Sequence, residues 1–204
     1  MNVAVSTERK PVHIWFAVFA LAAFAMPAMV ALTGIENRTI AAALVASPLL
    51  LLAKGAANAI ANSRTSTHPD GGAQARYVIR MLVITAFYIA SLFAALMLVG
   101  RDDPLSASTV ILAALPGIAV GAYFWAIGRL ITEMTDEFHK TLLVRQSLIA
   151  TGIKMAAASL YGFLENFGVT EHLDAFWWPI IWFAGFGIGA IANKVQFGTT
   201  GEIE

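Results

Sequence analysis

Six long apolar segments, separated by short polar stretches, dominate the pattern of this 204-residue chain. Each is close to the roughly 20 residues that an α-helix needs to cross a bilayer. The second contains Lys54, whose ammonium group must extend to the interface if that segment is to span. The pattern predicts an all-α polytopic membrane protein, a six-helix transmembrane bundle, with spans at about residues 12–33, 39–61, 77–99, 108–131, 142–164 and 176–193.

Two polar stretches within the chain differ in composition. Residues 62–76 are rich in Ser, Thr and Gly, which is typical of a linker. We therefore predict an N-terminal two-span hairpin (1–61), a cytoplasmic linker (62–76) and a four-span core (77–197). Residues 129–145 contain neither Gly nor Pro. There we predict that helix continues, with a tight break near 132–136.

Positive charge is distributed unevenly between the polar stretches. Alternate stretches lie on opposite sides of a membrane, and nine Lys and Arg residues then fall on one side and two, Arg38 and Arg101, on the other. Cytoplasmic loops carry an excess of Lys and Arg, so this split places both termini in the cytoplasm. The nine residues are Arg9, Lys10, Arg64, Arg76, Arg80, Arg129, Lys140, Arg145 and Lys194.

The overall composition agrees with a membrane protein. Hydrophobic residues make up 58% of the chain and charged residues 13%, against about 25% charged in soluble domains. The net charge of zero gives no global field for nucleic acid, which we exclude as a partner. The absence of cysteine excludes disulfides and thiolate metal sites.

Lys154 is the clearest candidate for chemistry, because it lies near the middle of the fifth segment. Its face on a helical period also carries Ser147, Thr151 and Tyr161, while the opposite face is a Leu/Ile stripe. An ionisable side chain within a membrane marks an ion, proton or substrate site by default. The alternative is a lysine solvated by hydroxyl and backbone oxygens inside the bundle. No segment carries a carboxylate near its middle to pair with it.

A second polar face lies on the third segment, where Thr85, Tyr88 and Ser91 follow a helical period. These residues could line a polar path together with Lys154. Hydrogen bonds between helices are the more common use of such residues in membranes.

Two GxxxG patterns predict close helix packing, since glycine lets two backbones approach. Gly117 and Gly121 form one pattern, and Gly185 and Gly189 form the other. We expect packing within one chain rather than a homodimer.

Acidic residues and a histidine gather in the second cytoplasmic stretch, at Glu133, Asp136, Glu137 and His139. Their spacing matches no zinc motif such as H-E-x-x-H. We interpret them as the solvated face of a helix, and predict no metal, cofactor or catalytic residue.

Short motifs in the second half resemble a group of small four-span bacterial inner-membrane proteins of unassigned function. They are Asp136-Glu137-Phe138, the run YGFLE at 161–165, and the aromatic start of the last segment at 177–179. The resemblance covers about 77–197. It implies a topology and a bacterial inner membrane, but no activity. The chain departs from the group by its extra hairpin and by Lys154, where a small or apolar residue is expected.

The sequence favours a non-enzymatic accessory or regulatory membrane subunit, with the bilayer and a membrane-protein partner or a second copy as its contacts. One alternative is a small transporter or channel that uses Lys154. Another is a membrane enzyme that acts on lipid. A cavity that reaches Lys154 would favour transport, and a closed bundle would favour the accessory role.

Overall fold

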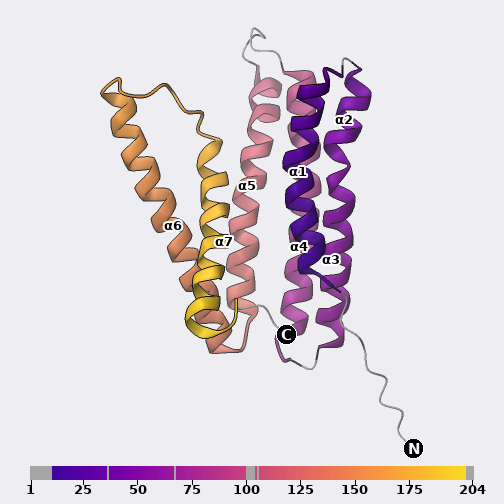
Figure 1. Ribbon diagram of the computed structural model, residues 1–204, viewed down its shortest axis with the longest axis vertical. Helices are drawn as coiled ribbons and strands as arrows, with labels where there is room; N and C mark the ends of the chain where they lie inside the picture. Colours follow the sequence, from indigo (N-terminus) through magenta and orange to yellow (C-terminus); the bar gives the residue numbers. More distant parts are fainter. Residues whose placement is uncertain (1–10, 36, 67, 100–103, 105, 201–204) are drawn as a thin grey trace, which may run out of the picture. The chain divides into compact units, whose positions relative to one another are not determined.

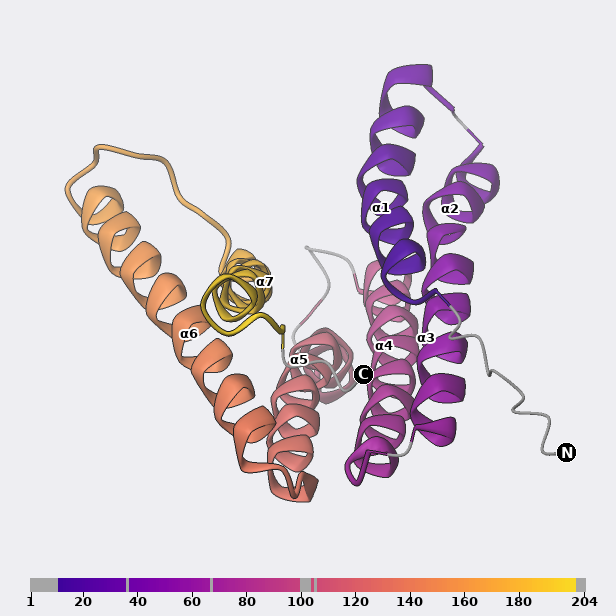
Figure 2. The ribbon, with the colours of Figure 1, turned by 60° about the horizontal axis from the view of Figure 1, so that its bottom comes forward.

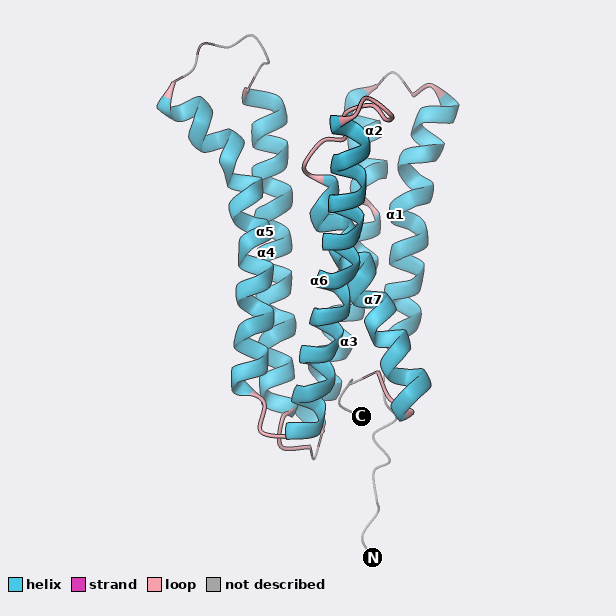
Figure 3. Cartoon of the chain, turned by 90° about the vertical axis from the view of Figure 1, so that its left-hand side faces the viewer, coloured by secondary structure: helices cyan, strands magenta, loops and turns pink. Residues whose placement is uncertain are grey.

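The computed structural model describes residues 11–35, 37–66, 68–99, 104 and 106–200. All regular structure within these residues is α-helical, as Figure 3 shows, which confirms the predicted class. The described chain forms seven helices: α1 (His13–Thr33), α2 (Arg38–Ala46), α3 (Pro48–Thr65), α4 (Gly71–Leu98), α5 (Ala107–Glu133), α6 (Glu137–Asn166) and α7 (Trp177–Phe197).

Four of these helices are long and apolar enough to cross a membrane, so the prediction of six spans is wrong. The candidate spans are Gly71–Ala95, Ala107–Glu133, Glu137–Asn166 and Trp177–Phe197. They match the last four predicted spans, and most of their large apolar side chains are exposed within the chain, a surface that lipid covers. The first predicted span corresponds to α1, which is not one of the four. The count covers described residues only, and several side chains of α1 lie outside them.

The second predicted span is divided into two helices. Ser47 separates α2 from α3, and its hydroxyl donates to the carbonyl of Leu44 (2.8 Å). Pro48 begins α3 and has no backbone N–H for the helical ladder. The second half of α3 then carries Asn58 and Arg64, so neither piece is a long apolar helix.

The predicted linker is shorter than expected, because helix occupies both of its ends. α3 continues to Thr65, and α4 already begins at Gly71. A side chain at Gly71 would place its Cβ 2.5 Å from the carbonyl oxygen of Ser63, so only glycine fits at this close approach. The predicted break near 132–136 is confirmed, since α5 ends at Glu133 and α6 begins at Glu137.

By internal contacts the chain divides into two compact units. Unit 1 comprises Met1–Thr67 and Gly71–Ala119, and unit 2 comprises His68–Asp70 and Val120–Glu204. This division differs from the predicted hairpin, linker and core, and α5 contributes to both units. Contact units and membrane domains are different divisions of a chain, so the hairpin, linker and core remain a prediction.

Helices α1, α3 and α4 pack together in unit 1 (Figure 1). A Cβ at Gly55 of α3 would lie 3.1 Å from the Cβ of Trp15, so this glycine brings α3 close to α1. The buried side chain of Asn58 donates to the carbonyl of Pro11 (2.9 Å). A hydrogen bond of this kind satisfies a polar group that would otherwise be costly to bury.

Candidate functional site

The two longest elements of unit 2, α6 and α7, are close at one end and apart at the other. Figures 1 and 2 show α6 inclined to α7, so that the two helices separate toward the connecting loop 167–176. We call residues 142–150 with 185–197 the tight end of the pair. Residues 151–166 with 177–184 form its open end.

Glycine allows the close approach at the tight end. A Cβ at Gly185 would lie 3.0 Å from the Cα of Ala150, and one at Gly189 would lie 2.9 Å from the Cα of Gln146. The approach at Gly189 is closer than real Cβ atoms show, and that at Gly185 is tighter than most of them, so a larger residue would require a shift of the neighbouring helix, above all at Gly189. By contrast, a Cβ at Gly117 or Gly121 would meet no atom within 4 Å in the described chain.

Polar side chains at the tight end are paired across the helices. Gln146 donates through Nε2 to the carbonyl of Phe186 (3.0 Å), and Asn193 donates through Nδ2 to the carbonyl of Leu142 (3.0 Å). Asn193 is fully buried. Pairing matters here because a buried amide without a partner is costly.

Arg145 adds a second layer of hydrogen bonds between the same helices. Its guanidinium donates to the side-chain oxygens of Asn193 (3.0 Å) and Gln196, and lies 5.0 Å from the centre of the Phe197 ring. The charge distribution along the chain placed Arg145 among the loop cations, whereas in the structure it takes part in helix packing.

A cleft of about 250 Å³ lies at the open end, and Lys154 is one of its walls. Its side chain is half-buried and makes no hydrogen bond or ion pair with the residues that the structure describes. Neither Asp nor Glu is among the lining residues. They are Phe124, Thr151, Lys154, Trp178, Pro179 and Trp182.

The aromatic wall of the cleft is held in place by a hydrogen bond. Trp182 donates through Nε1 to the hydroxyl of Thr151 (3.0 Å), and that hydroxyl donates to the carbonyl of Ser147 (2.9 Å). The ring of Trp182 also lies between those of Phe124 (centroids 4.6 Å apart) and Phe186 (5.2 Å). Thr151 therefore orients the indole of Trp182, and its hydroxyl is occupied. Lys154 is the cationic residue of the cleft lining.

The other residues predicted around Lys154 are not cleft walls. Ser147 donates to its own helix at Leu143, and Tyr161 donates to the carbonyl of Glu171 in the connecting loop (2.8 Å). Thr85 and Tyr88 belong to unit 1. Thr85 donates to Met81, and the carbonyl of Tyr88 accepts from Ser91. The structure thus brings together Lys154 and Thr151 of the predicted polar set.

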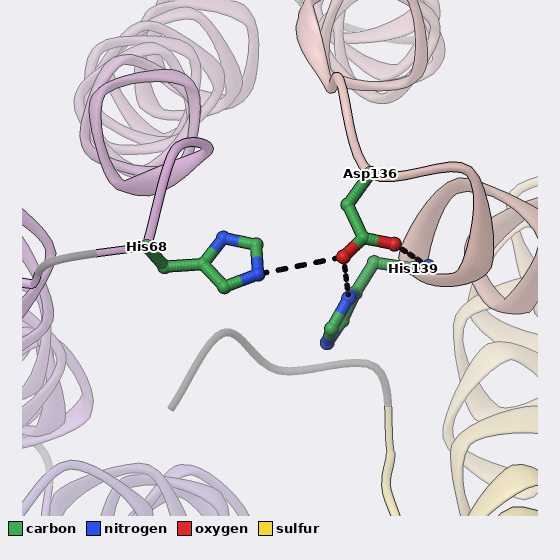
Figure 4. Close-up of side chains that lie close together, drawn as sticks. All are labelled: His68, Asp136 and His139. Carbon is green, nitrogen blue, oxygen red and sulfur yellow. Dashed lines mark hydrogen bonds and ion pairs between the residues drawn. The ribbon is translucent and has the colours of Figure 1, made fainter.

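A second cluster of unit 2 lies at the start of α6, where His68, Asp136 and His139 converge (Figure 4). Oδ2 of Asp136 is 3.6 Å from Nε2 of His68 and 3.3 Å from Nδ1 of His139. Oδ1 of the same carboxylate accepts the backbone N–H groups of Phe138 (2.8 Å) and His139 (3.1 Å), which caps the start of α6. The cap fixes the position of the carboxylate.

Asp70 holds His68 near this carboxylate. Its own buried carboxylate accepts three hydrogen bonds, from the hydroxyl (2.7 Å) and backbone N–H (2.6 Å) of Thr135 and from the backbone N–H of Asp136 (3.0 Å). Its backbone N–H donates to Nδ1 of His68 (3.2 Å). The segment His68–Asp70 is thus attached to the turn between α5 and α6.

Hydrogen bonding favours the charged form of both carboxylates. Burial raises the pKa of Asp70, but the hydrogen bonds from Thr135 and Asp136 together outweigh it, so this pKa is lowered. The backbone N–H of His139 is the main cause of the lowered pKa of Asp136, since burial opposes it only in part. Both groups therefore remain carboxylates near neutral pH.

This cluster is not apparent from the sequence, because His68 is distant from its other two members. Asp136 and His139 were grouped with Glu133 and Glu137, and all four were interpreted as a solvated helix face. Instead, Glu133 pairs with Arg129 (3.0 Å) and Glu137 pairs with Lys140 (2.7 Å), while the third member of the cluster is His68. The approach of His68 depends on the fold, and no local pattern in the sequence indicates it.

No family model, no curated protein and no solved structure matches this chain. The class therefore follows from its own structure. It is a multi-span integral membrane protein whose described residues are all-α in their regular structure and include four candidate spans. The predicted resemblance to small four-span bacterial proteins has support only in that number of spans.

Proposed function

We propose that this protein binds an anionic amphiphile in the cleft at Lys154 and acts as a small transporter or carrier of it. The observation that supports the proposal is a cationic side chain on the wall of an aromatic cleft that makes no hydrogen bond or ion pair with any residue the structure describes. A cavity that reaches Lys154 was the feature expected of a transporter rather than of an accessory subunit.

The electrostatics of the cleft favour an anion. A lysine at the centre of a membrane helix costs roughly 2.5–3.5 kcal/mol, and a bound anionic group offsets part of that cost. Lys154 is the charged residue of the cleft lining. Backbone N–H groups at the start of a helix can also bind an anion, but two of those at the start of α7 already donate to loop carbonyls, Trp177 to Asp174 (3.1 Å) and Trp178 to Ala175 (3.3 Å).

The remaining walls favour an apolar chain attached to the anion. Phe124, Trp178 and Trp182 present ring surface, and the hydroxyl of Thr151 is already used by Trp182. Phosphate and carboxylate headgroups share the chemistry that Lys154 recognises. A sugar would need several hydrogen-bonding groups around it, whereas most of the lining is aromatic or proline surface.

Fluorescence quenching tests the proposal, because two of the five tryptophans line the cleft. The purified protein is reconstituted with lipids brominated on the acyl chains, either phosphatidylglycerol or phosphatidylcholine. We expect the anionic lipid to quench more strongly than the zwitterionic lipid. A brominated fatty acid, compared at the same mole fraction, distinguishes a carboxylate from a phosphate ligand.

The Lys154→Met variant should lose this preference for anionic lipid. Lys194→Met is the matched control, because Lys194 is exposed in the last turn of α7, outside the cleft, and should keep the preference. Equal preference in the parent and Lys154→Met would overturn the proposal. The protein would then be assigned the accessory or regulatory role, for which co-purification of a partner in mild detergent is the test. A lipid-acting enzyme would require a catalytic set, which the cleft lining does not supply.

The proposed setting is a bacterial inner membrane with both termini in the cytoplasm, supported by the distribution of Lys and Arg. Single cysteines introduced into this cysteine-free chain test the orientation in intact cells. An impermeant thiol reagent should label His172→Cys in the loop between α6 and α7, and leave Thr65→Cys at the end of α3 unlabelled. The reverse result would invert the topology.

A further inference from the structure

We infer that His68, Asp136 and His139 form a binding site for a divalent transition metal ion of the zinc type. This site is separate from the Lys154 cleft and lies at the start of α6, where His139 is in the first turn of a candidate span and His68 and Asp136 precede the candidate spans that follow them. Two imidazole nitrogens and one carboxylate oxygen are ligands that zinc prefers. Magnesium and calcium favour all-oxygen ligand sets, so the two histidines argue against them.

The distances between the ligand atoms support the inference. Zinc bonds of about 2.0–2.1 Å in a tetrahedral arrangement put two ligand atoms about 3.3–3.4 Å apart. The two distances from Asp136 Oδ2, 3.3 Å to His139 Nδ1 and 3.6 Å to His68 Nε2, are close to this value. All three atoms lie within 4.8 Å of one another, so only a small movement of the His68 ring would complete the triangle.

The surroundings of the ligands also fit a metal. Oδ1 of Asp136 is occupied by the α6 cap, which leaves Oδ2 directed at the two rings. Nδ1 of His139 is buried and makes no hydrogen bond of good geometry with any described residue. The ligand side chains retain 16–31% of their exposure, so water can reach the fourth coordination position. Such a site has three protein ligands and one exchangeable position.

Metal binding requires one local rearrangement, at His68. Its Nδ1 accepts the N–H of Asp70, so in this arrangement the ring proton is on Nε2. Coordination through Nε2 moves that proton to Nδ1 and gives up the bond from Asp70, which is long at 3.2 Å. Without a metal, the cluster keeps this arrangement, with the carboxylate of Asp136 shared by His68 and His139.

Cobalt and zinc titrations of the untagged full-length protein in detergent test the site. Tetrahedral Co²⁺ gives visible absorption bands that octahedral Co²⁺ largely lacks. We expect the parent protein to develop these bands, to lose them when Zn²⁺ is added, and to melt at a higher temperature with Zn²⁺ present. Absence of the bands in the parent would overturn the inference. The cluster would then serve only to attach His68–Asp70 to the turn between α5 and α6.

Asp136→Asn is the most informative variant, because an asparagine oxygen can still cap α6 while a neutral amide is a poor zinc ligand. We expect affinity for Co²⁺ to fall at least about tenfold in Asp136→Asn and in His139→Ala. Glu137→Gln, one residue further on, and His172→Ala, in the loop after α6, are the matched controls and should bind as the parent does. Equal affinity in the parent, Asp136→Asn and His139→Ala would identify the metal as adventitious and overturn the site.

Discussion

The two ends of the α6–α7 pair show opposite solutions to packing helices in a membrane. At the tight end, glycines remove side-chain bulk, and the amides of Gln146 and Asn193 have partners across the interface. At the open end, aromatic rings line a cleft between the helices, and Lys154 makes no hydrogen bond or ion pair with the described residues. Paired polar groups and close backbones hold the tight end together, whereas the proposed ligand site lies where the cation has no such partner.

The largest expected effect comes from widening the tight end with Gly189→Leu. The new Cβ would lie 2.9 Å from both Cα and Cγ of Gln146, so α7 must shift and the nearby hydrogen bonds must break. Overpacking of this kind costs about 1–3 kcal/mol, and lost hydrogen bonds add to it. Thermal melting in detergent should show a clear fall in midpoint.

Gly187→Leu is the matched control for that prediction. It introduces the same side chain into the same helix, at an exposed position where no described atom lies within 4 Å of the new Cβ. Its midpoint should stay near that of the parent. If the two variants melt alike, α6 and α7 do not pack through the Gly185/Gly189 face.

A smaller loss of stability is expected for Asn193→Leu, which removes the hydrogen bonds of Asn193 to Leu142 and Arg145 across the tight end. Asn193 is fully buried, and its replacement leaves a guanidinium N–H of Arg145 without its acceptor. Arg145 is half-buried, so its unpaired donor should cost about 1 kcal/mol, the lower end of the range for buried donors. Gln196→Leu removes the other acceptor of Arg145 at an exposed position, where water can replace it, so its melting midpoint should change less. A larger loss in Gln196→Leu than in Asn193→Leu would contradict this account.

The sequence predicted one end of this pair better than the other. Small residues four apart are a local signal for close helix approach, and the structure has Gly185 and Gly189 against α6. The helical period also grouped Thr151 with Lys154. The aromatic walls could not be anticipated, because Phe124 comes from α5 and Trp178 and Trp182 from α7. Their meeting depends on how α6 is inclined to α7.

The largest error, six spans instead of four, also has a local cause. Apolar length alone suggested a second span at 39–61. That prediction did not take into account that Pro48 begins a new helix or that this helix carries Asn58 and Arg64. His68 was missed for the opposite reason, since its approach to Asp136 joins residues 68 positions apart and no local pattern encodes it.

The open end should respond to Lys154→Met with an increase in stability. Lys154 makes no hydrogen bond or ion pair with the described residues, so its removal leaves no partner unsatisfied. We expect a gain of a few tenths to about 1 kcal/mol, only part of the ~2.5–3.5 kcal/mol insertion cost, because the side chain is half-buried. Thermal melting without added lipid measures it. A lower midpoint than that of the parent would mean that Lys154 is a structural residue of the bundle.

The smallest expected effect is a pH dependence at the loop that joins the open ends. Nδ1 of His172 lies 2.7 Å from Oε1 of Glu165, and the hydrogen bond and charge of that carboxylate raise the pKa of His172 above its ordinary value of 6.5. Protonated His172 therefore favours the folded state. This contribution is fully present below pH 6.5 and is lost as the pH rises through the raised pKa. Because His172 is 75% exposed, the change in melting midpoint should be small, and salt should reduce it.

Glu165→Gln should lower the pKa of His172, measured by NMR titration of its imidazole, and should remove this part of the pH dependence. Glu171→Gln changes another exposed acid of the same loop and should leave the titration nearly as it is in the parent. If Glu165→Gln leaves the pKa of His172 unchanged, the pair does not connect the loop to α6, and the hydrogen bond from Tyr161 to Glu171 is the remaining described side-chain link between them.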